Sequence, residues 1–229
     1  TRYPRSLKPS SLTRKRVLFL SYTNSMPKIR WVVGVDEAGR GPLAGPVSVG
    51  VVAMTAHLYR EHTRIIGGIR DSKKLTELAR ERWYTLLRRE ARAGRIRVAT
   101  ALVSERIIDA RGISAALRIG IARTLARLQL NPVCSRVLLD GSLTAPKQWG
   151  NQQTIIRGDD RVALIAAASV LAKVRRDRYM VRLAPLYPRY HFEEHKGYGS
   201  AAHLRSIKRY GLSPIHRQSF CRSLPKSVR

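Results

Sequence analysis

Three short apolar runs in this chain lead into carboxylates, and this pattern narrows the folds that the chain can adopt. The runs and the acids that follow them are 31–35 (WVVGV) with Asp36 and Glu37, 137–139 (VLL) with Asp140, and 154–156 (TII) with Asp159. Short apolar runs are typical of buried strands, and the ends of strands are where an α/β sheet builds its sites. We therefore expect these four acids at neighbouring strand ends of one sheet.

The rest of the hydrophobic pattern predicts a mixed sheet that is flanked by helices. Further strands are predicted over 47–54 and 96–103, and helices over 75–93, 114–128, 161–183 and 201–210. Strands that alternate with helices in this way are typical of an α/β fold. We expect one domain, with a catalytic core over residues 28–184 and a small helical, basic C-terminal part over residues 185–229.

The charge balance of the chain predicts a polyanionic partner. The 44 Lys and Arg residues outnumber the 15 Asp and Glu residues, which gives a formal net charge of +29. A surplus of this size points first to nucleic acid and second to an acidic membrane surface. No apolar run approaches the roughly 18–20 residues of a membrane span. The two cysteines are too few for a disulfide scaffold, so we expect a cytoplasmic protein with no membrane partner.

The first 27 residues hold six basic residues and no acid, together with several prolines and serines. This composition predicts a basic tail with no fold of its own. The same composition also fits an organelle transit peptide, a bacterial-type extension or an over-extended start, and the sequence leaves these alternatives open.

Acids are scarce here, so four of them at neighbouring strand ends carry information. Carboxylates held close together repel one another unless divalent cations neutralise them. Mg²⁺ prefers such oxygen ligands and takes the remainder from water and substrate phosphates. An acidic pocket in a very basic protein therefore predicts a metal-dependent nuclease. Each acid alone is equally well explained as a turn or helix cap, so the prediction depends on the set.

The order and spacing of short motifs from about residue 31 to residue 221 resemble those of the ribonuclease HII family. The motifs are 35–47 (VDEAGRGPLAGPV), 71–75 (DSKKL), 139–141 (LDG), 158–159 (GD), 167–177 (AASVLAKVRRD), 195–198 (HKGY) and 216–220 (HRQSF). A lone Asp-Glu pair would be weak support, whereas an ordered series over nearly the whole chain is strong support.

The resemblance implies a ribonuclease H-like core and an endonuclease that uses Mg²⁺ or Mn²⁺. Its substrates would be the RNA strand of RNA–DNA hybrids and duplex DNA with an embedded ribonucleotide, nicked on the 5′ side of that residue to leave 3′-hydroxyl and 5′-phosphate ends. We expect it to act as a monomer. Carried over position by position, the catalytic and metal-binding carboxylates are Asp36, Glu37, Asp140 and Asp159.

The same resemblance assigns residues to substrate binding. Gly39, Arg40 and Gly41 would read the ribonucleotide, because glycines let the backbone approach a 2′-hydroxyl closely. Tyr198 would pack against the sugar at the RNA–DNA junction. Further basic residues are expected to contact phosphates, and these are Lys73, Lys74, Lys173, Arg176 and Lys196.

Two points within the acidic set stay open in the sequence. Asp160 directly follows Asp159, so the two compete for the fourth carboxylate position, and Asp159 is favoured because it follows a glycine. Asp36 and Glu37 are adjacent, and neighbours on a regular strand face opposite sides of the sheet. Either the strand breaks at Glu37, or one residue of the pair contributes through its backbone carbonyl.

Two other functions remain as alternatives. A ribonuclease HIII-type enzyme would share the fold and the carboxylates, but it usually has a lysine where Arg40 stands and a longer, folded N-terminal domain. A catalytically silent, basic RNA-binding protein would use the same positive surface. Such a binder would not need four strand-end acids in a chain that has only 15 acids.

Overall fold

A computed structural model describes residues 28–61, 63–69, 75–222 and 224, and it contains one mixed sheet. Its strands are β1 (Trp31–Ala38), β2 (Val47–Thr55), β3 (Arg97–Val103), β4 (Ser135–Asp140) and β5 (Gln152–Ile155). The strand order is β3-β2-β1-β4-β5, with antiparallel pairing on the β3 side of β1 and parallel pairing on the β5 side. The predicted α/β fold is confirmed, while the predicted tail lies outside the described residues.

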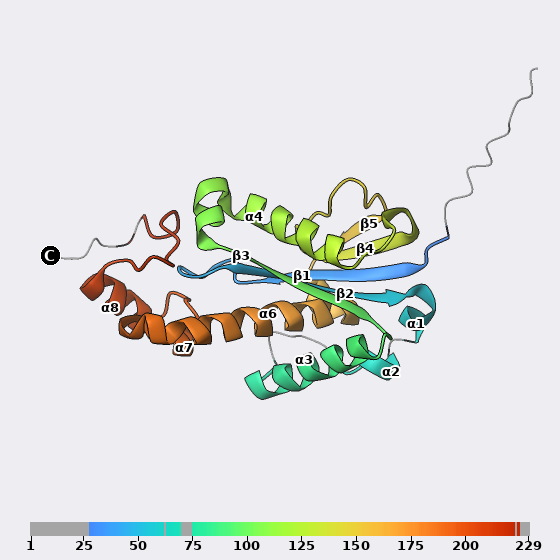
Figure 1. The fold of residues 1–229 in the computed structure, drawn as a ribbon, viewed down its shortest axis with the longest axis horizontal. Coiled ribbons are helices and arrows are strands. Elements are labelled where there is room, and N and C mark those ends of the chain that lie inside the picture. The colour runs from blue at the N-terminus through green and yellow to red at the C-terminus, as the bar shows by residue number, and fades with distance from the viewer. Residues whose placement is uncertain (1–27, 62, 70–74, 223, 225–229) are drawn as a thin grey trace, which may run out of the picture.

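Helices cover both faces of the sheet (Figure 1). They are α1 (Ala56–Arg60), α2 (Thr63–Ile66), α3 (Glu77–Arg92), α4 (Glu105–Arg127), α5 (Gly158–Arg161), α6 (Ala163–Leu183), α7 (Phe192–His195) and α8 (Ala201–Tyr210), with 3₁₀ turns at Pro132–Cys134, Ala184–Leu186 and Pro188–Tyr190. Helix α4 packs on one face, and α6 with α3 packs on the other. Across the described residues, no helix has both the length and the apolar character that crossing a membrane requires.

Each face of the sheet has its own apolar core, because the central strands are apolar on both sides. The α4 face buries side chains such as Val33, Val49 and Leu139, and the opposite face buries Val52, Leu138 and their neighbours against α6. Helix α6 approaches the sheet so closely that a Cβ at Gly50 would lie 2.2 Å from the carbonyl oxygen of Ala168 in α6. Close packing of α6 on β1 and β2 fixes one wall of the region where β1 ends.

Besides shifts of a few residues at the bounds of other elements, two elements differ from the sequence-based predictions in a way that matters for the site or the fold. Strand β1 continues past residue 35 to Ala38, so Asp36 and Glu37 lie within the strand and not after it. Helix α4 begins at Glu105, well before the predicted start at residue 114, because a second helical segment precedes a kink at Gly112. Gly112 has φ = 77°, a conformation that favours glycine, and this kink ends the continuous helical periodicity that the prediction used.

The C-terminal part of the chain builds a third apolar cluster around Phe192, Ile207 and Met180. Buried histidines lie against this cluster. His203 and His216 join through their Nε2 atoms at 3.0 Å, and the ring of His195 stacks on His203 with centroids 4.4 Å apart. Burial lowers the pKa of both His203 and His216 to about 4, so the cluster is neutral at neutral pH.

These histidines predict a loss of stability in mild acid. The unfolded histidines bind protons below about pH 6.5, whereas the folded ones resist protonation down to about pH 4. The free energy of unfolding is therefore highest above about pH 6.5. It decreases as the pH falls, by roughly 2 kcal/mol for each histidine at pH 5.

Urea unfolding at pH 7, 6 and 5 checks this prediction. The H203Q variant should show a flatter pH dependence than the parent protein, and the exposed His57 supplies the control, because H57Q should leave the slope unchanged. Equal free energies of unfolding at pH 7 and pH 5 would contradict the neutral cluster.

Candidate active site

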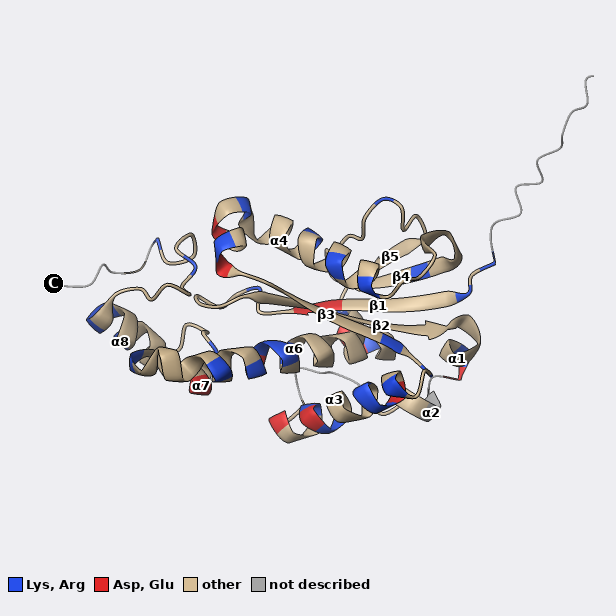
Figure 2. Ribbon diagram, in the orientation of Figure 1, with Lys and Arg blue, Asp and Glu red and all other residues tan. Residues whose placement is uncertain are grey.

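A cavity of about 330 Å³ lies where β1, β4 and α6 come together, and it contains three of the four predicted carboxylates. Figure 2 shows the acids of β1 near the centre of the molecule, with Lys and Arg spread over the surrounding helices. The residues that line the cavity are Asp36, Glu37, Ala38, Gly39, Arg40, Gly41, Arg80, Asp140, Ser169, Lys173 and Tyr198. The structure thus brings together residues that lie up to 162 positions apart in the sequence, from Asp36 to Tyr198.

Adjacent Asp36 and Glu37 both line the cavity although β1 does not break between them. The pairing of β1 with β2 continues through Glu37 opposite Val49 and Ala38 opposite Ser48. The first of the two sequence alternatives, a break at Glu37, is therefore wrong. The carboxyl of Glu37 lies close enough to Asp36 and Asp140 to interact with both. Neither a break nor a backbone ligand is needed to bring the pair to one cavity.

Burial and mutual repulsion raise the pKa values of this acidic pair. The pKa of Asp36 lies well above its usual value because the side chain is buried, and the neighbouring charges of Glu37 and Asp140 add to the shift. The pKa of Glu37 is raised mainly by burial, while Arg40 opposes the shift. The hydroxyl of Ser169 and the backbone amide of Glu37, at 2.7 Å, donate hydrogen bonds to Asp36 and favour its charged form.

The acidic pair has oxygen atoms that fit a divalent cation. Among the described residues, Asp36 Oδ2 and Glu37 Oε2 are buried and receive no hydrogen bond. Buried carboxylate oxygens without donors are costly, and hard cations such as Mg²⁺ and Mn²⁺ take such oxygens as ligands. The carboxylates present therefore fit a divalent metal site.

Asp140 ends β4, and its position is fixed by the segment that carries Asp159. The amide of Gly158 donates to Asp140 Oδ1 at 2.6 Å. Asp159 itself is buried in the short helix α5, whereas Asp160 is exposed. Asp159 was predicted at or just past a strand end; it lies four residues after the last residue of β5, Ile155, within α5, and it does not line the cavity.

The Gly39–Arg40–Gly41 segment forms one wall of the cavity. Arg40 Nε lies 3.0 Å from Glu37 Oε1, so a half-exposed cation sits at the edge of the acidic group. Gly39 has φ = +91°, a conformation that side chains rarely adopt, and a Cβ at Gly41 would meet no atom within 4 Å. The backbone at Gly41 is therefore open to close approach by a ligand.

Tyr198 and Lys173 also line the cavity. Tyr198 is 41% exposed, and Lys173 Nζ lies 5.2 Å from the centre of its ring. Lys173 also pairs with Asp177 at 3.0 Å. An exposed aromatic ring beside a lysine offers both a flat apolar face and a positive charge to a ligand.

Two further basic residues predicted for substrate binding, Lys196 and Arg176, do not line this cavity. Lys196 Nζ donates to the carbonyls of Glu193 and Glu194. Arg176 was expected to contact phosphate, and that prediction is wrong, because its side chain is completely buried. Lys73 and Lys74 lie outside the described residues.

Two polar lining residues, Arg80 and Ser169, were missed by the sequence reasoning. Ser169 is a lone hydroxyl in the apolar first half of α6, and that isolation was the available signal. Arg80 is one of many arginines in α3, and nothing in the sequence separates it from the rest.

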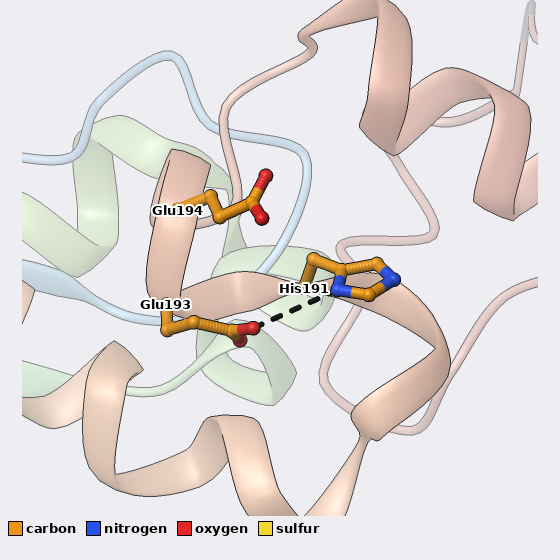
Figure 3. A group of neighbouring side chains, drawn as sticks. All are labelled: His191, Glu193 and Glu194. Atoms are coloured by element: carbon orange, nitrogen blue, oxygen red, sulfur yellow. Dashed lines mark ion pairs between the residues drawn. The ribbon is translucent and has the colours of Figure 1, made fainter.

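A second group of metal-ligand types lies on the surface, away from the cavity. His191, Glu193 and Glu194 are all exposed, with ligand atoms within 4.8 Å of one another (Figure 3). His191 Nδ1 lies 3.6 Å from Glu193 Oε1. The proximity of His191 and Glu193 is therefore accounted for by an ion pair on the surface.

The sequence of this chain is similar to sequences of one known protein family. The family model described as Ribonuclease HII matches residues 33–223. A ribonuclease HII from Caldicellulosiruptor bescii is 42% identical over 195 residues, which cover 85% of this chain and 88% of that protein.

Solved structures agree with the fold. The ribonuclease HII in a complex with PCNA from Archaeoglobus fulgidus has a TM-score of 0.66 at 25% identity, over 86% of this chain and 97% of that one. The ribonuclease H2 from Pyrococcus horikoshii has a TM-score of 0.61 at 25% identity, over 85% and 96% of the two chains.

Proposed function

Since this chain belongs to the ribonuclease HII family, we propose that it is a divalent-metal-dependent endonuclease acting on RNA–DNA hybrids and on duplex DNA with an embedded ribonucleotide. We propose Mg²⁺ or Mn²⁺ as the metal and cleavage on the 5′ side of the ribonucleotide, leaving 3′-hydroxyl and 5′-phosphate ends. We also propose that it acts as a monomer.

One observation carries the proposal: an acidic cavity and an open backbone loop adjoin each other in a chain of net charge +29. Asp36, Glu37 and Asp140 lie beside Gly41 and Tyr198 in one cavity. The acids suit hard cations, the loop suits close contact with a sugar, and the positive surplus suits a phosphate backbone. A silent RNA-binding protein has no use for the acidic part.

We assign roles to the residues as follows. Asp36, Glu37 and Asp140 would hold the divalent cations, with Asp159 as the proposed fourth carboxylate. When bound, the cations supply a water of lowered pKa and offset the negative charge that develops on the phosphate. The backbone at 39–41 would contact the 2′-hydroxyl, and Tyr198 would pack on the next sugar. Lys173 would contact a neighbouring phosphate through a charge-assisted bond.

Cleavage of a labelled RNA strand annealed to DNA tests this proposal. With Mg²⁺ or Mn²⁺ the RNA strand should be cut, and EDTA should stop the cutting until metal is added in excess. Tight binding of the hybrid with no cutting under any metal would favour the silent binder. Cutting of the hybrid but not of a duplex with one ribonucleotide would favour the ribonuclease HIII-type alternative.

Replacing Tyr198 by alanine should reduce cleavage at a single ribonucleotide more than cleavage of a continuous hybrid. A single junction offers one sugar for the ring to pack on, whereas a continuous hybrid offers many registers. Loss of such a contact is worth roughly 1–3 kcal/mol, or about fivefold to a hundredfold in relative rate. The ratio of kcat/KM for the two substrates measures the effect.

Tyr210 provides a matched control for this substitution. It is 39% exposed, close to the exposure of Tyr198, and its ring also has guanidinium neighbours, with Arg189 and Arg209 each 5.2 Å from the centre. Y210A should leave the substrate ratio unchanged. An equal change of the ratio in both variants would remove the special role of Tyr198.

A further inference from the structure

Two arginines, Arg176 in α6 and Arg217 after α8, are completely buried. Among the residues that the structure describes, neither guanidinium takes part in an ion pair. A buried charge without a counter-charge is costly unless all its donors are satisfied. The hydrogen bonds of these two guanidiniums must therefore offset the cost of burying their charge.

Arg217 binds the backbone of the loop that lines the cavity. Its Nη2 and Nη1 donate to the carbonyls of Gly39 and Arg40 at 2.7 and 2.9 Å. Its Nε donates to the carbonyl of Gly45 at 2.9 Å, at the other end of the same loop. One planar guanidinium thus holds both ends of the loop, using the fixed geometry of its N–H groups.

Arg176 joins the same loop to the turn that carries Tyr198. Its Nε and Nη2 donate to the carbonyls of Pro46 and Ala44 at 2.9 and 3.0 Å. Its Nη1 donates to the carbonyl of Lys196 at 2.9 Å, two residues before Tyr198. Its Cζ also lies 5.5 Å from the centre of the Tyr198 ring.

The packing between these parts leaves little room for movement. A Cβ at Gly39 would lie 2.1 Å from Arg176 Nε, so the loop backbone rests directly on the guanidinium. The amide of Leu43 also donates to the carbonyl of Gly197 at 2.9 Å, which links the loop to the tyrosine turn a second time. The loop, the turn and the two guanidiniums are therefore packed and hydrogen-bonded as one unit.

The carboxylates of the cavity are held by other means. Asp36 and Glu37 are placed by the pairing of β1 with β2, and Asp140 is placed by β4 and the amide of Gly158. Neither buried arginine donates a hydrogen bond to these acids. A change in the arginines should therefore move the loop and the tyrosine turn while leaving the carboxylates in place.

We propose that Arg176 and Arg217 are positioning residues that fix the 39–41 loop relative to Tyr198 and thereby set the preference for a single ribonucleotide. The inference rests on the proposed function, because it concerns how the same cavity selects its substrate. A single ribonucleotide must meet the loop and the tyrosine at once, so its cleavage depends on their relative position. A continuous hybrid can bind in many registers and depends on that position less.

Both arginines can make these contacts as charged groups at neutral pH, because a guanidinium keeps its proton in a protein. Burial lowers the pKa of Arg217 to about 9, and the neighbouring charge of Arg176 acts in the same direction. A lysine in either place could not reach several carbonyls with a planar group, and burial would favour its neutral form. Lysine substitution therefore removes the planar hydrogen-bonding geometry while keeping a long side chain.

The experiment compares kcat/KM for a duplex with one embedded ribonucleotide and for a continuous hybrid in the R217K variant. We expect the ratio of the two values to fall by about tenfold, the effect of one or two lost bonds from a charged donor, with cleavage of the hybrid largely retained. The control is R178K on the same helix as Arg176. Arg178 is largely exposed and pairs with Glu81, so this variant should keep the parent ratio.

A purely structural role would lower the active fraction of enzyme and reduce both activities equally. Equal losses on the two substrates, or an unchanged ratio, would therefore overturn the inference. If R217K shows no cooperative melting, R176K carries the same test, and failure of both to fold would also overturn it. If the parent protein cuts neither substrate, the proposed function itself fails, and that outcome is distinct from a normal parent with an unaltered variant.

Discussion

Replacing Asp140 by asparagine should stop cleavage while the protein stays folded and still binds a hybrid. Asparagine keeps an oxygen that can accept the 2.6 Å hydrogen bond from the amide of Gly158, so the end of β4 should hold its position. It removes one of the three carboxylate charges that line the cavity. Metal assistance is worth several kcal/mol, so we expect a fall in kcat on the order of a thousandfold or more.

Asp160, the exposed neighbour of Asp159, supplies the matched control for the D140N experiment. Asp160 lies on the surface of α5, and D160N removes the same charge outside the cavity. Single-turnover cleavage and hybrid binding should be measured for both variants. Near-parental cleavage by D140N, with D160N also normal, would remove Asp140 from the site. Loss of activity in D160N but not in D159N would show that the favoured order of this pair is reversed.

Replacing Asp36 by asparagine should raise the free energy of unfolding in EDTA and should reduce the stabilisation by Mg²⁺. In EDTA the variant should be more stable than the parent by roughly 1–3 kcal/mol, because a buried carboxyl and its repulsion by Glu37 and Asp140 are removed. The parent should gain stability when Mg²⁺ is added, by about 2.7 kcal/mol at a hundred times the dissociation constant. The variant should gain little. Substitutions at active sites commonly raise stability while lowering activity.

Urea unfolding with EDTA and with Mg²⁺ measures both effects without any reliance on activity. Asp109 gives the contrasting variant, because its carboxylate accepts hydrogen bonds from the amides of Gln218 and Ser219 at 2.9 Å and holds the C-terminal segment on α4. D109N should lose stability and keep its response to Mg²⁺. A parent-like response to Mg²⁺ in D36N would contradict the assignment of Asp36 as a metal ligand.

The sequence predicted the sheet and most of the acidic cavity because both follow from local patterns. Apolar runs of strand length mark β1 and β4, and each leads into an acid that lines the cavity. The position of Asp159 was not predictable in the same way. Asp159 lies in a single helical turn, α5, that begins after a left-handed residue, Arg157 with φ = 52°, and neither feature has a distinctive local pattern.

The buried arginines show a second limit of sequence reasoning. In a chain with 44 Lys and Arg residues, the expectation for any one of them is a solvated surface position. Arg176 was predicted to contact phosphate, yet it lies beneath the cavity wall, where it binds carbonyls from segments 130 residues away in the sequence. Such a position depends on the tertiary structure, because the carbonyl acceptors are brought together only when α6 packs on the loop after β1.

Cleavage of a DNA duplex with one embedded ribonucleotide tests the central claim most directly. The labelled duplex is incubated with Mg²⁺ at neutral pH beside an all-DNA duplex of the same sequence, the D140N variant and an EDTA control, and the ends of the product are mapped. The proposed function predicts one nick, on the 5′ side of the ribonucleotide, and no cutting in the three controls. Tight binding of the ribonucleotide duplex without any nick, under Mg²⁺ or Mn²⁺, would contradict it.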